Sequence, residues 1–204
     1  MTVVLLHDLG DPEGGARWRA VAPREWVIPD LPGHGETPAV RSGHYDPMAV
    51  VTLGRWAIED PATTTVVGIG ANAHAALMLA AGDQCARVVI VDGLWGPIPT
   101  VPEDIDALYA RVRAMADDLA ATAMAPSSGL DPRTAHGYGV SIATSFLQRF
   151  WVGVECPLRA IETPASPTAP EERAERLSWF GGEVELLELA AGDPAAVIEA
   201  ATPR

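Results

Sequence analysis

Short apolar segments recur along the chain, each bounded by polar or turn-forming residues. Most are continuous runs of Val, Ile and Leu rather than alternations of apolar and polar positions. This pattern is typical of strands that are buried on both faces of a parallel sheet. The six predicted strands are Val3–His7, Trp26–Asp30, Thr65–Ile69, Val88–Asp92, Leu158–Glu162 and Val184–Leu189.

Helical patterns separate most of these strands. Asp46-Pro47 has the composition of a helix start, and small residues dominate a helix predicted over Ala71–Ala81. Two capping boxes, Thr100–Glu103 and Thr168–Glu171, predict further helix starts. The alternation predicts an α/β fold, a mainly parallel six-stranded sheet with helices on both faces. Ligands of such sheets bind beyond the carboxyl ends of the strands, so the residues there are the candidates for chemistry.

A long segment, residues 94–155, separates the fourth and fifth predicted strands. It contains an amphipathic helical pattern, a loop of small residues and a second helical stretch. An insertion of this length over the carboxyl ends of the strands is typical of a lid. We therefore predict a single domain, residues 1–204, with residues 94–155 as a short helical lid or cap.

Composition and charge narrow the possible partners. The 204 residues include 27 acidic and 14 basic side chains, all of the latter Arg, for a net charge of −13. Such a charge argues against nucleic acid and against anionic membranes, because both require a basic face. A small-molecule ligand, a protein partner or a homo-oligomer remains possible.

The expected cellular compartment depends on whether any apolar segment resembles a signal peptide or a membrane span. The first residues have neither the basic region nor the long apolar region of a signal peptide. Ala62–Gly82 carries no charge and has the length of a membrane span, but it contains polar residues and changes period midway, as a strand followed by a helix does. A cytoplasmic protein is expected. The two cysteines, Cys85 and Cys156, each precede a predicted parallel strand and could be neighbours in space; we expect them to be reduced.

Three motifs in the first third of the chain resemble those of the α/β-hydrolase family. His7-Asp8-Leu9-Gly10 follows the first strand, and Asp30-Leu31-Pro32-Gly33-His34-Gly35 follows the second. Gly68-Ile69-Gly70-Ala71-Asn72 follows the third strand, where the family has its Gly-x-Ser-x-Gly nucleophile elbow. The resemblance covers essentially the whole chain and implies the α/β-hydrolase fold.

The catalytic positions implied by the resemblance depart from the family. The elbow serine is replaced by Gly70, which offers no nucleophile. The family's histidine position reads Ala191-Gly192-Asp193, and the turn of the family's acid, residues 163–167, has no carboxylate. We therefore expect the Ser-His-Asp triad to be missing, which would make the chain pseudo-hydrolase-like.

The resemblance also implies an oxyanion hole built from backbone N–H groups, which by position are those of Ala71 and Leu9. These donors survive side-chain replacement, so a pocket able to polarise a carbonyl is expected to persist. Asp8 stands where the family has Gly, however, and its carboxylate would oppose an oxyanion if it faced the pocket.

The remaining candidates each have a structural and a chemical interpretation. His7 either braces the loop after the first strand, the interpretation that we favour, or takes part in chemistry. His74, one helical turn after Gly70, is either a buried hydrogen-bonded histidine or directed at the pocket. Asp193 is either the N-cap of a helix beginning at Pro194, again favoured, or a base with a raised pKa in an apolar pocket. Trp95 either lines the pocket or anchors the lid.

Three functions remain open at this point. The first is a non-hydrolytic enzyme acting on a small organic molecule by proton transfer, as a lyase, isomerase or cyclase of a biosynthetic route, with Asp193, His7, Asp8 and His74 as residues to test. The second is a non-catalytic pseudo-hydrolase that binds a ligand or a protein partner. The third is a hydrolase with a rewired site using Ser141, Ser145 or Ser166. No metal-binding spacing occurs, the partial dinucleotide fingerprint is weak, and no cofactor is predicted.

Overall fold

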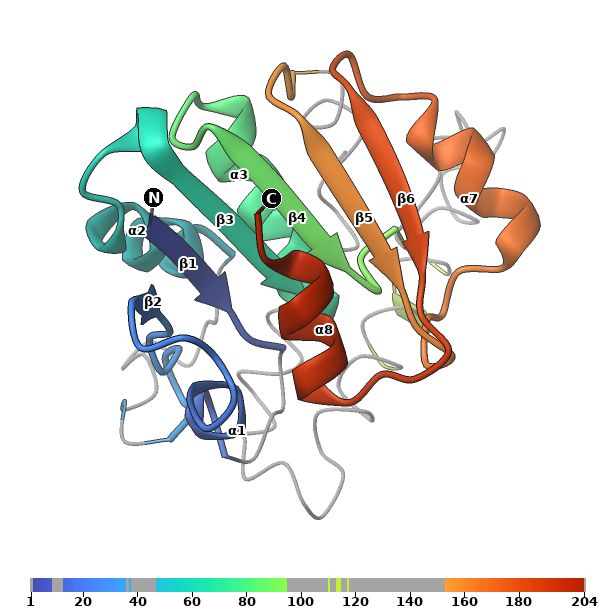
Figure 1. Cartoon of the computed structure of the whole chain (residues 1–204). Helices are drawn as coiled ribbons and strands as arrows, with labels where there is room; N and C mark the ends of the chain where they lie inside the picture. The colour runs from blue at the N-terminus through green and yellow to red at the C-terminus, as the bar shows by residue number, and fades with distance from the viewer. Residues whose placement is uncertain are drawn as a thin grey trace.

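The computed structural model describes residues 2–8, 13–35, 37, 47–94, 110, 113, 114, 117 and 153–203. These residues contain one six-stranded sheet in the order β2-β1-β3-β4-β5-β6, and every neighbouring pair of strands is parallel (Figure 1). The strands are β1 Thr2–Leu6, β2 Trp26–Val27, β3 Thr64–Ile69, β4 Arg87–Val91, β5 Leu158–Glu162 and β6 Val184–Glu188. The predicted α/β fold with a six-stranded parallel sheet is confirmed.

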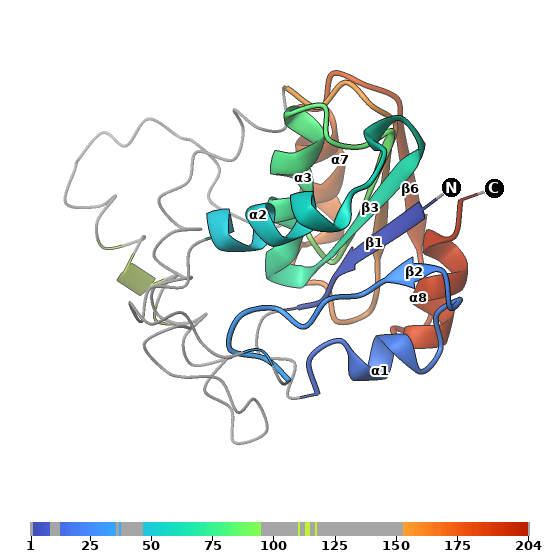
Figure 2. The ribbon, with the colours of Figure 1, turned by 90° about the vertical axis from the view of Figure 1, so that its left-hand side faces the viewer.

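Helices cover both faces of the sheet. The described elements are α1 Ala16–Arg19, α2 Pro47–Ala57, α3 Ala73–Ala81, α7 Pro170–Leu177 and α8 Pro194–Ala201, with 3-10 turns η1 Pro61–Thr63 and η2 Gly70–Asn72. The edge-on view places α2, α3 and α7 on one side of the sheet and α1 and α8 on the other (Figure 2). This arrangement follows from right-handed crossovers between parallel strands.

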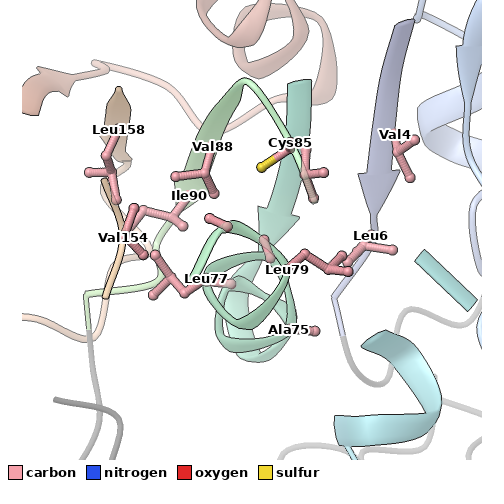
Figure 3. Packing of buried hydrophobic residues seen from close by; sticks show 14 of the residues in the cluster. Val4, Leu6, Ala75, Leu77, Leu79, Cys85, Val88, Ile90, Val154 and Leu158 are labelled. Atoms are coloured by element: carbon pink, nitrogen blue, oxygen red, sulfur yellow. The ribbon is translucent and has the colours of Figure 1, made fainter. Parts of the chain in front are cut away.

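One apolar cluster lies on each face of the sheet. On the α3 side, Leu77 and Leu79 pack against inward side chains of β3 and β4 such as Val88 and Ile90 (Figure 3). On the other side, Trp18 of α1 and the α8 residues Val197 and Ile198 pack against alternate residues of the same strands. Strands β1, β3 and β4 are buried on both faces, as their apolar runs predict, and β5 is buried although it contains Arg159 and Glu162. The edge strand β6 is largely exposed.

Several predicted element bounds differ from those of the structure, and two of the differences have a local reason. β2 ends at Val27 rather than Asp30, because the Ile28 carbonyl oxygen accepts a hydrogen bond from the Arg19 side chain instead of a neighbouring strand. Thr168 does not form the predicted capping box. Ala169 is the N-cap of α7, in the extended conformation that the following Pro170 imposes, and no side chain caps that end.

The uncharged stretch Ala62–Gly82 is β3, the turn η2 and α3, as its change of period predicts. The helix itself begins at Ala73, two residues later than predicted. No helix in the described part of the chain has the length and apolar character needed to cross a membrane. Most of the predicted lid, the capping box at Thr100, Leu9 and Trp95 lie outside the described residues.

Candidate functional site

The turn after β3 retains the backbone conformation of a strained elbow. Gly70 has φ +54°, in the left-handed region that strains any residue with a Cβ. The chain then passes through η2 into α3, so the turn points toward the carboxyl edge of the sheet. Gly68 permits this sharp return, because a Cβ there would lie 2.6 Å from the Asn72 carbonyl oxygen and 2.7 Å from Ala73 Cα. The elbow is therefore present in shape but carries no side chain.

The carboxylate of Asp8 occupies the space in front of this elbow. A Cβ on Gly70 would collide with Asp8 Oδ1, Cγ and Oδ2. Asp8 Oδ1 accepts a hydrogen bond of 2.9 Å from the backbone N–H of Ala71. That N–H is the donor expected to form the oxyanion hole, so the expectation of a donor open to a substrate carbonyl is wrong. A carboxylate of the protein already holds it.

His7 connects the loop of Asp8 to the loop after β2. Its ring is fully buried, and Nε2 accepts a 3.2 Å hydrogen bond from the Leu31 backbone N–H. Nε2 is therefore unprotonated, and Nδ1 carries the proton that it donates to the Asp8 carbonyl oxygen at 3.0 Å. The His7 carbonyl oxygen in turn accepts a 2.6 Å hydrogen bond from Asn72 Nδ2. These contacts fix the backbone on which the Asp8 carboxylate is carried.

The second motif after β2 braces the same region. Asp30 Oδ1 accepts hydrogen bonds from the Gly15 N–H at 2.8 Å and from Arg19 at 3.0 Å. Burial acts to raise the pKa of Asp30, but these two donors and the positive charge of Arg19 hold it below its ordinary value overall. The His34 ring lies edge-on to the His7 ring, with centroids 5.0 Å apart. These residues position the site rather than supply its chemistry.

A second carboxylate, that of Asp92, joins the loop after β4 to the loop after β5. Asp92 has the left-handed φ of +49°, unusual for a non-glycine residue at the end of a strand. Its two oxygens accept hydrogen bonds from the Thr163 N–H and the Thr163 hydroxyl, each 2.7 Å long. A Cβ on Gly192 would lie 3.1 Å from the same hydroxyl. The Asp92 carboxylate thus fixes the start of the loop after β5, and Gly192 of the loop after β6 lies close to the same threonine.

Asp193 follows Gly192 in the loop after β6 and is exposed. It is the N-cap of α8, and its Oδ1 accepts a 3.1 Å hydrogen bond from the Ala196 N–H. The structure thus has the cap that the Asp-Pro pair predicts. The alternative expectation of an Asp193 carboxylate in an apolar pocket is wrong. His74 is buried in the first turn of α3.

Glu162 is a buried carboxyl group that the sequence interpretation passed over. Its side chain is fully buried at the end of β5, accepts a hydrogen bond from the Ser166 hydroxyl and lies 3.5 Å from Arg173 Nε. Burial, followed by the negative charges of Asp92 and Glu188, raises the pKa of Glu162. Ser166, one of the candidate nucleophiles of a rewired site, is thereby engaged as the donor to this carboxyl group. A charged residue ending an apolar strand was the available signal.

Two surface grooves lie away from this carboxyl edge. One, of about 330 Å³, runs between β6 and α8, and the other, of about 190 Å³, lies at the amino ends of β4, β5 and β6. Both are lined by Arg159, which binds Glu185 at 2.7 Å and the Ala200 carbonyl oxygen at 2.7 Å. Arg159 is thus engaged in holding α8 to the sheet. Among the residues that the structure describes, no cluster of three His, Cys, Asp or Glu side chains is placed to hold a metal ion.

Comparison with known proteins places this geometry in a known fold. No protein-family model and no curated protein matches the sequence. A hydrolase from Oleispira antarctica is 15% identical over 98% of this chain and 86% of its own, with a TM-score of 0.68. The enol-lactonase from Burkholderia xenovorans LB400 is 19% identical over 98% and 86%, with a TM-score of 0.66. An alpha/beta hydrolase from Sphaerobacter thermophilus DSM 20745 is 19% identical over 98% and 90%, with a TM-score of 0.61. The chain has the α/β-hydrolase fold.

Proposed function

We propose that this α/β-hydrolase-fold chain lacks the hydrolytic triad and is a non-hydrolytic enzyme that acts on a small organic molecule by proton transfer, with the Asp8 carboxylate as the general base. One observation carries the proposal: the Asp8 carboxylate stands where the side chain of an elbow nucleophile would stand, bonded to the Ala71 N–H. A reactive group is thus supplied to the same place from a different strand.

The same observation argues against acyl transfer. That chemistry needs a nucleophile on the elbow and unengaged N–H donors for the developing oxyanion. Gly70 supplies no nucleophile, and the Ala71 donor is held by a carboxylate whose negative charge would repel an oxyanion. Hydrolysis through this elbow is therefore disfavoured on two counts.

A carboxylate in this position suits proton abstraction. Its backbone is fixed by His7, so its oxygens are held in a defined orientation at the carboxyl edge of the sheet. The substrate class that we propose is a small molecule with an acidic C–H next to a carbonyl group. Asp8 takes the proton and so becomes neutral as the enolate forms, and the charge repulsion that opposes acyl transfer does not arise. His7 is a positioning residue in this scheme, and His74 is a further candidate that lies one helical turn from the elbow.

The direct test follows exchange of acidic C–H protons in D2O. A panel of small ketones, β-keto acids and enol esters is incubated with the protein, and loss of the C–H signal is measured by proton NMR. We expect exchange with the wild type and a loss of at least about 100-fold in Asp8→Asn, since general bases contribute roughly that much. The asparagine can still accept from the Ala71 N–H, so the fold is preserved.

Asp60→Asn is the matched control. Asp60 also accepts a backbone N–H, that of Ala62, but it lies before β3 at the opposite edge of the sheet. Exchange should be unchanged in this variant. Exchange that survives in Asp8→Asn would overturn the role of Asp8, and labelling of the wild type by a fluorophosphonate would overturn the non-hydrolytic assignment.

The same bond between Asp8 and Ala71 also favours a second candidate, a non-catalytic pseudo-hydrolase, because it closes the former site from within. The net charge of −13 would suit a basic protein partner in that case. Native mass spectrometry of the protein from its own host separates the two functions. A co-purifying small molecule supports the enzyme, and a stoichiometric partner chain supports the binding protein.

A further inference from the structure

Two thiols come together at the amino edge of the sheet, opposite the edge that carries Asp8. Cys85 precedes β4 and Cys156 precedes β5, and the two strands are in register from Val88 and Leu158 onward. The Val88 N–H donates a 3.1 Å hydrogen bond to the Pro157 carbonyl oxygen, which joins the two approaches. Both cysteines are free and belong to the same apolar cluster beneath α3, where Figure 3 shows Cys85.

The two thiols differ in access to solvent and in acidity. Cys85 is buried, whereas Cys156 is half-buried. A hydrogen bond from the Cys85 thiol lowers the pKa of Cys156, and the backbone N–H groups of Cys156 and Val88 act in the same direction. That interaction, together with burial, raises the pKa of Cys85. The more accessible thiol is thus also the one with more of the reactive thiolate form.

We propose that Cys85 and Cys156 form a reversible dithiol–disulfide pair that small aliphatic disulfides oxidise, with Cys156 as the attacking thiol and Cys85 as the resolving thiol. The Cys156 thiolate attacks one sulfur of the small disulfide and expels the other as a thiolate, leaving a mixed disulfide. Cys85 then loses its proton and attacks Cys156 Sγ, which expels the second small thiolate. The two protein thiols lose two electrons and two protons in total, and the small disulfide is reduced to two thiols.

The disulfide would join the starts of β4 and β5 covalently. The closed loop would include β4 and the whole segment that separates it from β5. Closing so long a loop lowers the entropy of the unfolded chain and therefore stabilises the folded state. Because the Asp8 site lies at the other edge of the sheet, this inference does not depend on the proposed function.

To test this proposal, the reduced, folded protein is incubated with oxidised glutathione, the reaction is quenched with acid, and the mass of the intact protein is measured. We expect the wild type to lose two hydrogens, to retain no glutathione and to melt roughly 5–10 °C higher, reversibly with dithiothreitol. Cys85→Ala should keep one glutathione on Cys156, because the resolving thiol is absent. Cys156→Ala should resist modification, because Cys85 is buried.

Wild-type protein that keeps its glutathione as Cys85→Ala does, or that does not react, would overturn the pair. Modification of Cys85 in Cys156→Ala at the wild-type rate would overturn the assigned order of attack. A second measurement uses only the wild-type protein, so it does not depend on whether a variant folds. Phenylarsine oxide bridges two thiols only when they lie within reach of each other. Binding of one equivalent to the folded wild type is expected, and its absence would contradict the proposal.

Discussion

The Asp8 carboxylate lies in the space that a Cβ on Gly70 would need. The two residues are 62 positions apart in sequence, yet they meet because β1 and β3 are parallel neighbours whose carboxyl ends coincide, with Leu6 opposite Gly68. A carboxylate at position 8 and a side chain at position 70 exclude each other. The glycine at the elbow and the aspartate in the neighbouring loop are therefore sterically coupled.

This coupling predicts a non-additive mutant cycle. Gly70→Ala should lower the free energy of unfolding by about 2–4 kcal/mol, because it adds left-handed strain and displaces Asp8. In the Asp8→Ala background the collision is gone, and the same substitution should cost only about 1–2 kcal/mol. Urea unfolding of the four proteins gives the coupling energy. Additivity to within about 0.5 kcal/mol would contradict a direct contact.

A second prediction concerns the proton on His7. Because Nε2 accepts from the Leu31 N–H, the neutral ring should carry its proton on Nδ1. Nitrogen-15 correlation spectra of the imidazole distinguish the two tautomers directly. His7→Ala should lower the free energy of unfolding by about 2–4 kcal/mol, since it opens a buried cavity and removes an acceptor from Leu31. A ring protonated on Nε2 would show that the loops are joined differently.

A third prediction tests the role of Asp193 as the cap of a helix. Because Asp193 is the N-cap of α8, Asp193→Ala should lower the free energy of unfolding by about 1 kcal/mol. Asp193→Ser should restore it, because serine also caps well. C–H exchange activity should not change in either variant. Activity that disappears in Asp193→Ser while stability is kept would return Asp193 to the role of a base.

The sequence predicted the strands and the elbow well, because both depend on local patterns. Apolar runs identify β3 and β4, and the Gly68–Asn72 spacing marks the turn between β3 and α3. The Asp8 contact could not be predicted in the same way. Strand order brings the loop of Asp8 next to the elbow, but the orientation of Asp8 depends on tertiary contacts such as the hydrogen bonds of His7. The role of Glu162 was missed for a related reason, since burial of a strand-end carboxyl group depends on the helix that packs over it.

The last prediction concerns pH and rests on Glu162. Its pKa is raised above the ordinary value of 4.5, chiefly by burial, so the folded state holds its proton to higher pH than the unfolded chain does. The stability that this group contributes is present in full below about pH 4.5 and is lost as the pH rises through the folded pKa. Glu162→Gln keeps a neutral side chain at every pH. The free energy of unfolding of the wild type, minus that of Glu162→Gln, should therefore fall from about pH 4 toward neutrality, by at most about 1.4 kcal/mol per pH unit.

Urea unfolding of both proteins across that range measures the difference, and Glu185→Gln provides the matched control. Glu185 also lies in β6 and binds an arginine, Arg159, at 2.7 Å, but its side chain is 52% exposed, so its removal relieves no buried charge. The fall with pH should therefore be specific to Glu162→Gln. A difference that stays constant, or that grows as the pH rises, would mean that Arg173 and Ser166 stabilise the ionised carboxylate by more than burial opposes it.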